Sequence, residues 1–176
     1  MDQQHPDKPA LHLTLFTDYI CPFCYIGDLR LRHLEEFYQV LVNFRFIEIH
    51  PETPHTGAST RSLDYSEEQW GGMMDGLLVM AGDEGIDLTP PSFIANSHAA
   101  LLLAEAAKEA GREKFYALHR KIYEAYFLQG RDIGDSTVLT DLASDSGLSS
   151  ALVEKAWTDA DYEKTLRKNM AMAIQA

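Results

Sequence analysis

The sequence has only two cysteines among its 176 residues, too few for the disulfide framework of a secreted scaffold. Charged residues interrupt every apolar stretch, so no run reaches the roughly 18 apolar residues that a membrane helix needs. The opening stretch MDQQHPDKPA also lacks the basic start and apolar segment of a signal peptide. We therefore expect a cytoplasmic protein with no membrane partner.

Basic residues are scarce beside acidic ones. The chain has 15 lysines and arginines against 27 aspartates and glutamates, which gives a net charge of -12 at pH 7. A charge of this sign repels phosphate backbones and anionic lipids at long range, so we expect no nucleic-acid partner. The length suits one sizeable domain, or a small domain that carries a large insertion.

Several catalytic and metal-binding signatures are also absent. The sequence contains no glycine-rich phosphate loop, serine elbow or paired-carboxylate arrangement. Its seven histidines form no close pair, and a structural zinc site needs four ligands, so zinc held with His50 or His55 has little support. We interpret His98 and His119 as structural residues.

The first fifty residues have a pattern typical of one βαβ unit. Residues 11–17, LHLTLFT, alternate and predict a strand. Apolar residues then recur at helical spacing from Pro22 to Leu41 and predict a helix with the proline in its first turn. Residues 44–49, FRFIEI, predict a second strand, which should run parallel to the first after a right-handed crossover.

The rest of the sequence predicts helices alone. Residues 51–62, PETPHTGASTRS, are rich in turn formers and predict a connection that leaves the sheet. Methionines 73 and 74 are interpreted as core, with a soft surface for unfolded peptide as the alternative. The first helix is expected from Ser66, which forms a capping box with Gln69, to near Gly82. Two more are expected from Ser97 to Ala110 and from Phe115 to Tyr126. The last two should run from a cap at Asp135 or Ser136 to before Gly147, and from Ser149 or Ser150 to the final alanine.

The two cysteines stand at the predicted start of the first helix, in the stretch YICPFCYIG. With two residues between them, their sulfurs can close a disulfide across the first turn. Free backbone N–H groups and the helix dipole favour the Cys21 thiolate by about one pKa unit, whereas a nearby Asp18 would oppose it. We expect Cys21 to be a reachable, moderately acidic nucleophile and the shielded Cys24 to resolve the mixed disulfide.

A CxxC pair has other interpretations, namely half of a zinc site or unreactive packing. The position of this pair, after a strand and at a helix start, favours redox chemistry.

Longer stretches of the sequence resemble a known family. The segments TDYICPFCYIG and LHRKIYEAYFLQGRDIGDSTVLTDLASDSGL, with HPE after the second strand and an all-helical stretch between, closely resemble the DsbA-like thioredoxin-fold oxidoreductases. They resemble the cytosolic FrnE-like branch in particular. The similarity runs from about Leu11 to the C-terminus, so it covers nearly the whole chain.

The resemblance implies an α/β fold in which a large all-helical domain interrupts a thioredoxin-like βαβ unit. Residues 11–62 would form the N-terminal part of the thioredoxin-like domain, 63–165 the helical insertion and 166–176 the start of the return. Cys21 matches the nucleophile of the family and Cys24 its resolving cysteine.

Family members continue after the helical domain with a loop that carries a cis-proline, and then with two more strands. This sequence ends at Ala176, and its last proline is Pro91. We therefore expect that it is truncated, or that another chain completes its sheet, as in a homodimer.

We expect a thiol-disulfide oxidoreductase, acting as reductase or isomerase on disulfide or thiol substrates. No dissociable cofactor is expected, with glutathione a possible electron donor. The alternatives are a glutathione-dependent isomerase or transferase of the kappa type, a non-enzymatic peptide-binding module and a zinc-binding protein.

Overall fold

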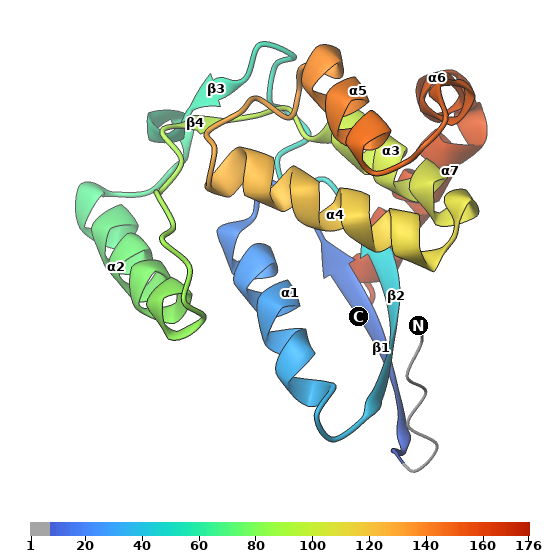
Figure 1. Cartoon of the computed structure of the whole chain (residues 1–176). Coiled ribbons are helices and arrows are strands. Elements are labelled where there is room, and N and C mark those ends of the chain that lie inside the picture. Colours follow the sequence, from blue (N-terminus) through green and yellow to red (C-terminus); the bar gives the residue numbers. More distant parts are fainter. Residues whose placement is uncertain (1–7) are drawn as a thin grey trace.

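The computed structural model describes residues 8–176, in which two parallel strands are followed by a mainly helical chain (Figure 1). The predicted α/β class is confirmed. The elements, in chain order, are β1 (Ala10–Thr17), α1 (Pro22–Leu34), β2 (Gln39–Phe46), β3 (Ala58–Ser59), α2 (Glu67–Asp83), β4 (Phe93–Ile94), α3 (His98–Ala107), α4 (Arg112–Phe127), α5 (Ser136–Asp145), α6 (Ser150–Thr158) and α7 (Ala160–Ala173).

The predicted βαβ unit is present, with α1 as the connection between two parallel strands. β1 and β2 pair along their whole length. The prediction of a second strand over residues 44–49 was wrong in its bounds, because β2 begins at Gln39 and ends at Phe46. Leu41 continues the apolar spacing of α1, but it lies between two β-branched valines that favour a strand.

Two short strands that the sequence did not predict join the loops on either side of α2. β3 and β4 pair antiparallel over two residues each, which is too short for a periodic signal. Gly57 leads into β3 with a φ of 75°, and a Cβ atom there would lie 2.9 Å from the Ile94 carbonyl oxygen. Glycine meets both demands, since it lacks a Cβ and tolerates positive φ.

The helix starts largely follow the predicted caps. Ser66 and Gln69 form the capping box of α2, and Asp135 caps α5. The prediction of one continuous final helix was wrong, because Asp159 separates α6 from α7. Its backbone is extended, and its carboxylate accepts a hydrogen bond from the Asp161 N–H at 2.9 Å, an arrangement that aspartate favours over a helix interior.

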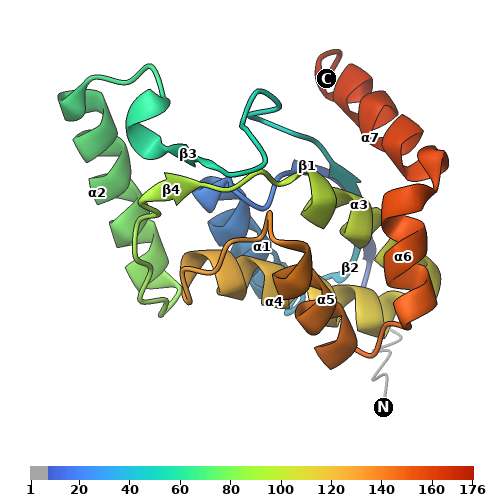
Figure 2. The same cartoon turned by 90° about the horizontal axis from the view of Figure 1, so that it is seen from above.

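The helices cover the sheet unevenly. Figure 2 shows α2 at one end of the molecule and α6 with α7 at the other, while α3 and α4 lie between them. Buried aromatic rings of β2 and α4 surround His119. The buried residues form one connected core, so the division into 11–62, 63–165 and 166–176 stays a prediction.

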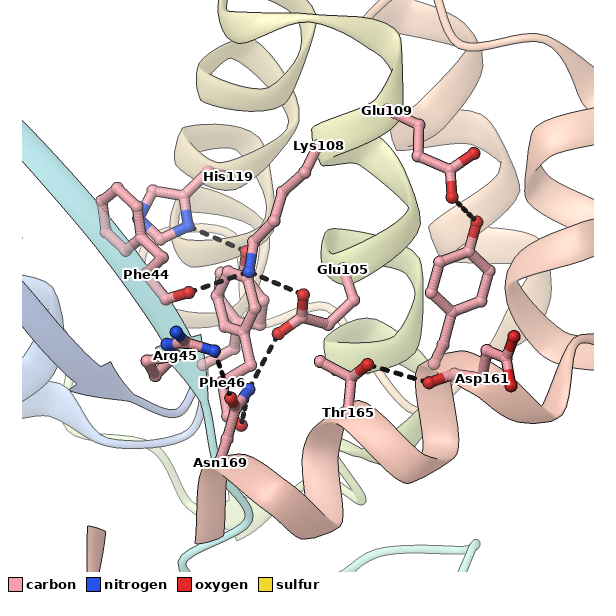
Figure 3. Close-up of polar contacts among 12 residues, drawn as sticks. Phe44, Arg45, Phe46, Glu105, Lys108, Glu109, His119, Asp161, Thr165 and Asn169 are labelled. Atoms are coloured by element: carbon pink, nitrogen blue, oxygen red, sulfur yellow. Dashed lines mark hydrogen bonds and ion pairs between the residues drawn. The ribbon is translucent and has the colours of Figure 1, made fainter. Parts of the chain in front are cut away.

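A polar network holds the end of β2 against α3 and α7 (Figure 3). Asn169 donates hydrogen bonds to the Phe46 carbonyl at 3.1 Å and to the Glu105 carboxylate at 2.9 Å. Lys108 donates to the Phe44 carbonyl at 2.8 Å and to Glu105 at 2.6 Å. Buried polar groups cost free energy unless they are partnered, so these bonds fix the strand whose exit loop forms part of the site.

Candidate active site at the start of helix α1

Both cysteines lie where β1 gives way to α1. The helix begins at Pro22, so Cys21 is its N-cap residue and Cys24 lies in its first turn, as predicted. The Cys24 backbone N–H donates a hydrogen bond to the Cys21 Sγ at 3.4 Å. The two residues approach each other to 3.0 Å, and both are free cysteines. Both are half-buried, so Cys24 is less shielded than expected.

The two thiols lie close enough to titrate as a pair. The interaction with Cys21 is the largest cause that lowers the pKa of Cys24 to about 7, and the interaction with Cys24, together with burial, raises the pKa of Cys21. Because the loss of the first proton belongs to the pair, the role of Cys21 as the acidic nucleophile stays a prediction.

Asp18 lies fully buried beneath the active-site turn. Its carboxylate accepts hydrogen bonds from the Ile20 N–H at 3.3 Å and the Ile49 N–H at 2.9 Å. Burial raises the pKa of this carboxyl to about 6, although these bonds and one from the Ser97 side chain oppose the rise. Its charge raises the pKa of both cysteines, which is the direction that the sequence predicted.

An apolar groove of about 190 Å³ opens beside Cys21. Three large apolar side chains of its lining are well exposed, namely Phe23 at 43%, Ile49 at 39% and Tyr65 at 50%. Exposed apolar residues that gather around a concave site mark a binding surface. No aspartate, glutamate, lysine or arginine is among the described residues that line the groove; these include Ile20, Pro22, His50, Leu63, Trp70, Met73, Met74, Ile94 and Tyr126.

This arrangement of a cysteine pair at a helix start is found in a chain that matches a known protein family. The model of the DSBA-like thioredoxin domain matches residues 12–176. The chain belongs to the DSBA-like thioredoxin family. Its fold and the general chemistry of its relatives are those of the thiol-disulfide oxidoreductases.

Relatives of this DSBA-like chain come from several bacteria. The uncharacterized protein YwbO of Bacillus subtilis (strain 168) is 23% identical over 168 residues, which cover 94% of this chain and 81% of YwbO. The crystal structure of a probable DsbA oxidoreductase, SCO1869 of Streptomyces coelicolor, matches with a TM-score of 0.80 at 25% identity, covering 93% and 75% of the two chains. The cytosolic disulfide reductase DsbM of Pseudomonas aeruginosa with GSH shares the fold, with a TM-score of 0.63 at 21% identity and 94% and 78% coverage.

Sequence reasoning missed two residues of this DSBA-like site. Thr17 ends β1, and its hydroxyl lies 2.6 Å from the hydroxyl of Tyr123 in α4. The sequence offered only a weak signal for Thr17, namely its hydroxyl group directly before Asp18. Nothing in the sequence pointed to Tyr123, because 106 residues separate it from Thr17.

The helical histidines of this DSBA-like chain occupy hydrogen-bonded structural positions, as predicted. His119 is fully buried, with its ring nitrogens 2.8 Å from the Tyr19 hydroxyl and 3.3 Å from the Asp28 carboxylate. His98, at the start of α3, bonds two glutamates.

The part of the chain that the structure describes lacks both a metal-binding cluster and a membrane-spanning helix. Among residues 8–176, no three histidine, cysteine, aspartate or glutamate side chains are grouped so that they could hold a metal ion. No helix in the same range combines the length and apolar character that spanning a membrane requires.

Proposed function

We propose that this protein is a cytoplasmic thiol-disulfide oxidoreductase of the FrnE-like branch, in which Cys21 and Cys24 interconvert between dithiol and disulfide. The observation that carries the proposal is the position of Cys21, which caps α1, accepts a hydrogen bond from the Cys24 N–H and borders the groove. The motifs CPFC and AYFLQGRDIGD support the branch. The redox equivalents reside in the two sulfurs, so no dissociable cofactor takes part.

The reduction of a substrate disulfide proceeds in two exchanges. Cys21 reacts as its thiolate: it attacks the substrate disulfide, forms a mixed disulfide and releases one substrate sulfur as a thiolate. Cys24 then loses its proton and attacks the Cys21 sulfur, and the second substrate sulfur leaves and takes up a proton. Two electrons pass to the substrate, which becomes two thiols, while the protein gains one disulfide.

The groove supports a polypeptide substrate with an apolar side chain next to its disulfide. Such a side chain is removed from water when it enters a lining of this kind. Glutathione carries two carboxylates, and the described lining offers them no lysine or arginine. We therefore assign glutathione the role of an electron donor that reacts at Cys21 without tight binding. In a reducing compartment the protein would act as a reductase or isomerase.

Trapping of the mixed disulfide tests the proposal. C24S should accumulate a covalent adduct with a disulfide-bonded peptide, detectable by intact mass, whereas C21S should form none. Peptides with leucine beside the disulfide should react faster than peptides with glutamate at the same place. The proposal is wrong if C24S forms no adduct with any peptide while the variant remains folded.

The same variants separate the alternatives. A kappa-type enzyme would bind glutathione tightly, and its activity would be indifferent to C24S. A non-enzymatic module would bind apolar peptide equally well in C21S and would form no adduct in either variant.

A further inference from the structure

The edge of β2 that faces away from β1 carries backbone groups that no strand of residues 8–176 bonds, because β1 and β2 form a sheet of two strands there. At one end of β2 the Gln39 N–H donates to the Pro9 carbonyl at 3.0 Å. Just after the other end, Ile47 donates to the Thr17 carbonyl of β1 at 3.0 Å. Successive residues of a strand direct their N–H and C=O groups to opposite edges. The odd-numbered residues of β2 therefore bond β1, and the even-numbered residues face away from it.

Two contacts agree with this alternation and mark where the free edge ends. The Phe44 carbonyl accepts a hydrogen bond from Lys108 at 2.8 Å, and the Phe46 carbonyl accepts one from Asn169 at 3.1 Å (Figure 3). Both donors come from outside the sheet. On the same edge, no described residue bonds the N–H or C=O groups of Val40 and Val42. A strand edge with unpaired groups is a template on which a further strand can form.

A hollow of about 420 Å³ runs along this free edge. Its lining includes the five consecutive residues 40–44, whose side chains alternate between the two faces of the sheet, so the hollow follows the strand edge rather than one face. A second hollow of about 260 Å³ shares Val40, Val42 and Phe44 with the first and continues along α1. Ligand clefts in proteins measure roughly 300 to 1,000 Å³, so a short extended segment fits here.

The charge of the first hollow is opposite to that of the whole chain. Lys108, Arg112 and His12 line it, and none of its described lining residues is acidic, although the chain has a net charge of -12. Lys108 is paired with Glu105 at 2.6 Å. Arg112 forms no ion pair with a described residue, and its guanidinium lies over the Tyr116 ring, 5.5 Å from the centroid. The hollow therefore favours a ligand with acidic side chains.

We propose that the free edge of β2 is a docking site for an extended acidic segment of a partner protein, which adds to the sheet as a further strand. The backbone of the segment would bond the free groups of Val40 and Val42. Its acidic side chains would approach Lys108 and Arg112, while the alternate side chains would lie on the opposite face, near Leu41. The hollow shares no lining residue with the groove beside the cysteines, so the inference goes beyond the proposed function and does not depend on it.

The test uses the ¹⁵N-labelled full chain and a fluorescent peptide of about eight residues that alternates glutamate and valine, which places every glutamate on one face of a strand. In NMR spectra, the peptide should slow hydrogen exchange at the amides of Val40, Val42 and Phe44. The amides of Leu41 and Asn43 already face β1 and should gain no protection. A bound peptide that leaves the edge amides unprotected would overturn the inference, and so would the absence of binding.

Fluorescence anisotropy tests the charge of the site. A matched lysine–valine peptide should bind about tenfold more weakly to the wild type. R112E should bind the glutamate peptide about fivefold more weakly than the wild type, and the loss should be smaller at about 200 mM salt than at about 20 mM. K114E is the control and should stay within about twofold of the wild type, because Lys114 is exposed on the same helix but does not line the hollow. Equal affinities for the two peptides, or equal losses in R112E and K114E, would contradict the assignment.

Two further outcomes separate this site from other uses of the chain. Protection of the edge amides that grows with protein concentration in the absence of peptide would assign the edge to a second copy of the chain and overturn the inference. C21S should bind the glutamate peptide as tightly as the wild type. A failure of the redox reaction therefore refutes the proposed function alone, whereas a loss of peptide binding in C21S would place the peptide in the groove and refute the docking site.

Discussion

The Asp18 carboxylate accepts a hydrogen bond from the Ile49 backbone N–H at 2.9 Å, across 31 residues of sequence. Ile49 lines the groove, and Asp18 lies under the turn that carries Cys21. The bond therefore holds the cysteines and one wall of the groove in a fixed relation. It also keeps a carboxylate in the protein interior, where burial raises its pKa to about 6.

Replacement of Asp18 by asparagine should change how stability depends on pH. A carboxyl group with a raised pKa binds its proton more tightly in the folded than in the unfolded protein. Between about pH 4 and pH 6 the free energy of unfolding therefore falls as pH rises, by about 3 kcal/mol for a shift of two units. In D18N this contribution should be absent. Urea unfolding at pH 4, 5, 6 and 7 measures it.

The matched control is D135N, because Asp135 is an exposed N-cap and asparagine caps a helix equally well. D135N should parallel the wild type between pH 4 and 6. Parallel curves for D18N and the wild type would show that the buried carboxyl does not carry the dependence.

A charge placed in the groove should weaken the reaction with apolar peptides. We expect M73K to lower kcat/KM about tenfold for a peptide with leucine beside its disulfide, since a lysine must be desolvated when the peptide binds. Its reaction with oxidised glutathione should change by less than about twofold. V79K is the control, because Val79 lies on the same helix, is 67% exposed and is not part of the groove lining. Equal losses in M73K and V79K would contradict the assignment of the groove.

His98 should titrate above its ordinary pKa, because its ring lies between two carboxylates. Nδ1 is 3.1 Å from Glu48 and Nε2 is 3.0 Å from Glu163, and the bond with Glu48 is the largest cause of the raised pKa. The stabilisation is present below about pH 6.5 and is lost as pH rises through the raised pKa. NMR titration should show a larger fall of this pKa in E48Q than in E163Q. The reverse order would contradict the geometry.

Alanine at Gly57 should destabilise the link between β3 and β4. The new Cβ would meet the Ile94 carbonyl at 2.9 Å and would also have to accept a positive φ. Gly85 is a natural control, since its φ is 70° but nothing lies within 4 Å of a Cβ there. We expect G85A to cost about 1 kcal/mol for the backbone conformation and G57A about 1 to 3 kcal/mol more. Equal losses in urea unfolding would remove the steric explanation.

The elements with strong local signals could be predicted from the sequence. The alternation of residues 11–17 predicted a strand, and Pro22 and the capping box of Ser66 with Gln69 predicted helix starts. Each of these local patterns lies in the element that it predicted. The boundary between α1 and β2 could not be predicted, since Leu41 fits both periodicities. The break at Asp159 and the two-residue strands depend on tertiary contacts that leave little trace in sequence.

The cysteine pair could be predicted because CxxC at a helix start combines a spacing with a position. The hydrogen bond between Thr17 and Tyr123 could not be predicted, since 106 residues of sequence separate them. The burial of Asp18 could not be predicted either, because it depends on segments that are distant in sequence, such as the loop that carries Ile49. A homodimer that completes the sheet stays a prediction.

The proposed function requires that Cys21 and Cys24 form a reversible redox couple. The most direct test is the fraction of intramolecular disulfide after equilibration in glutathione buffers of graded potential, read by alkylation and intact mass. We expect a single transition between roughly -120 and -270 mV, the range from strongly oxidising to strongly reducing members of the thioredoxin superfamily. A protein that forms no Cys21–Cys24 disulfide at any potential would contradict it.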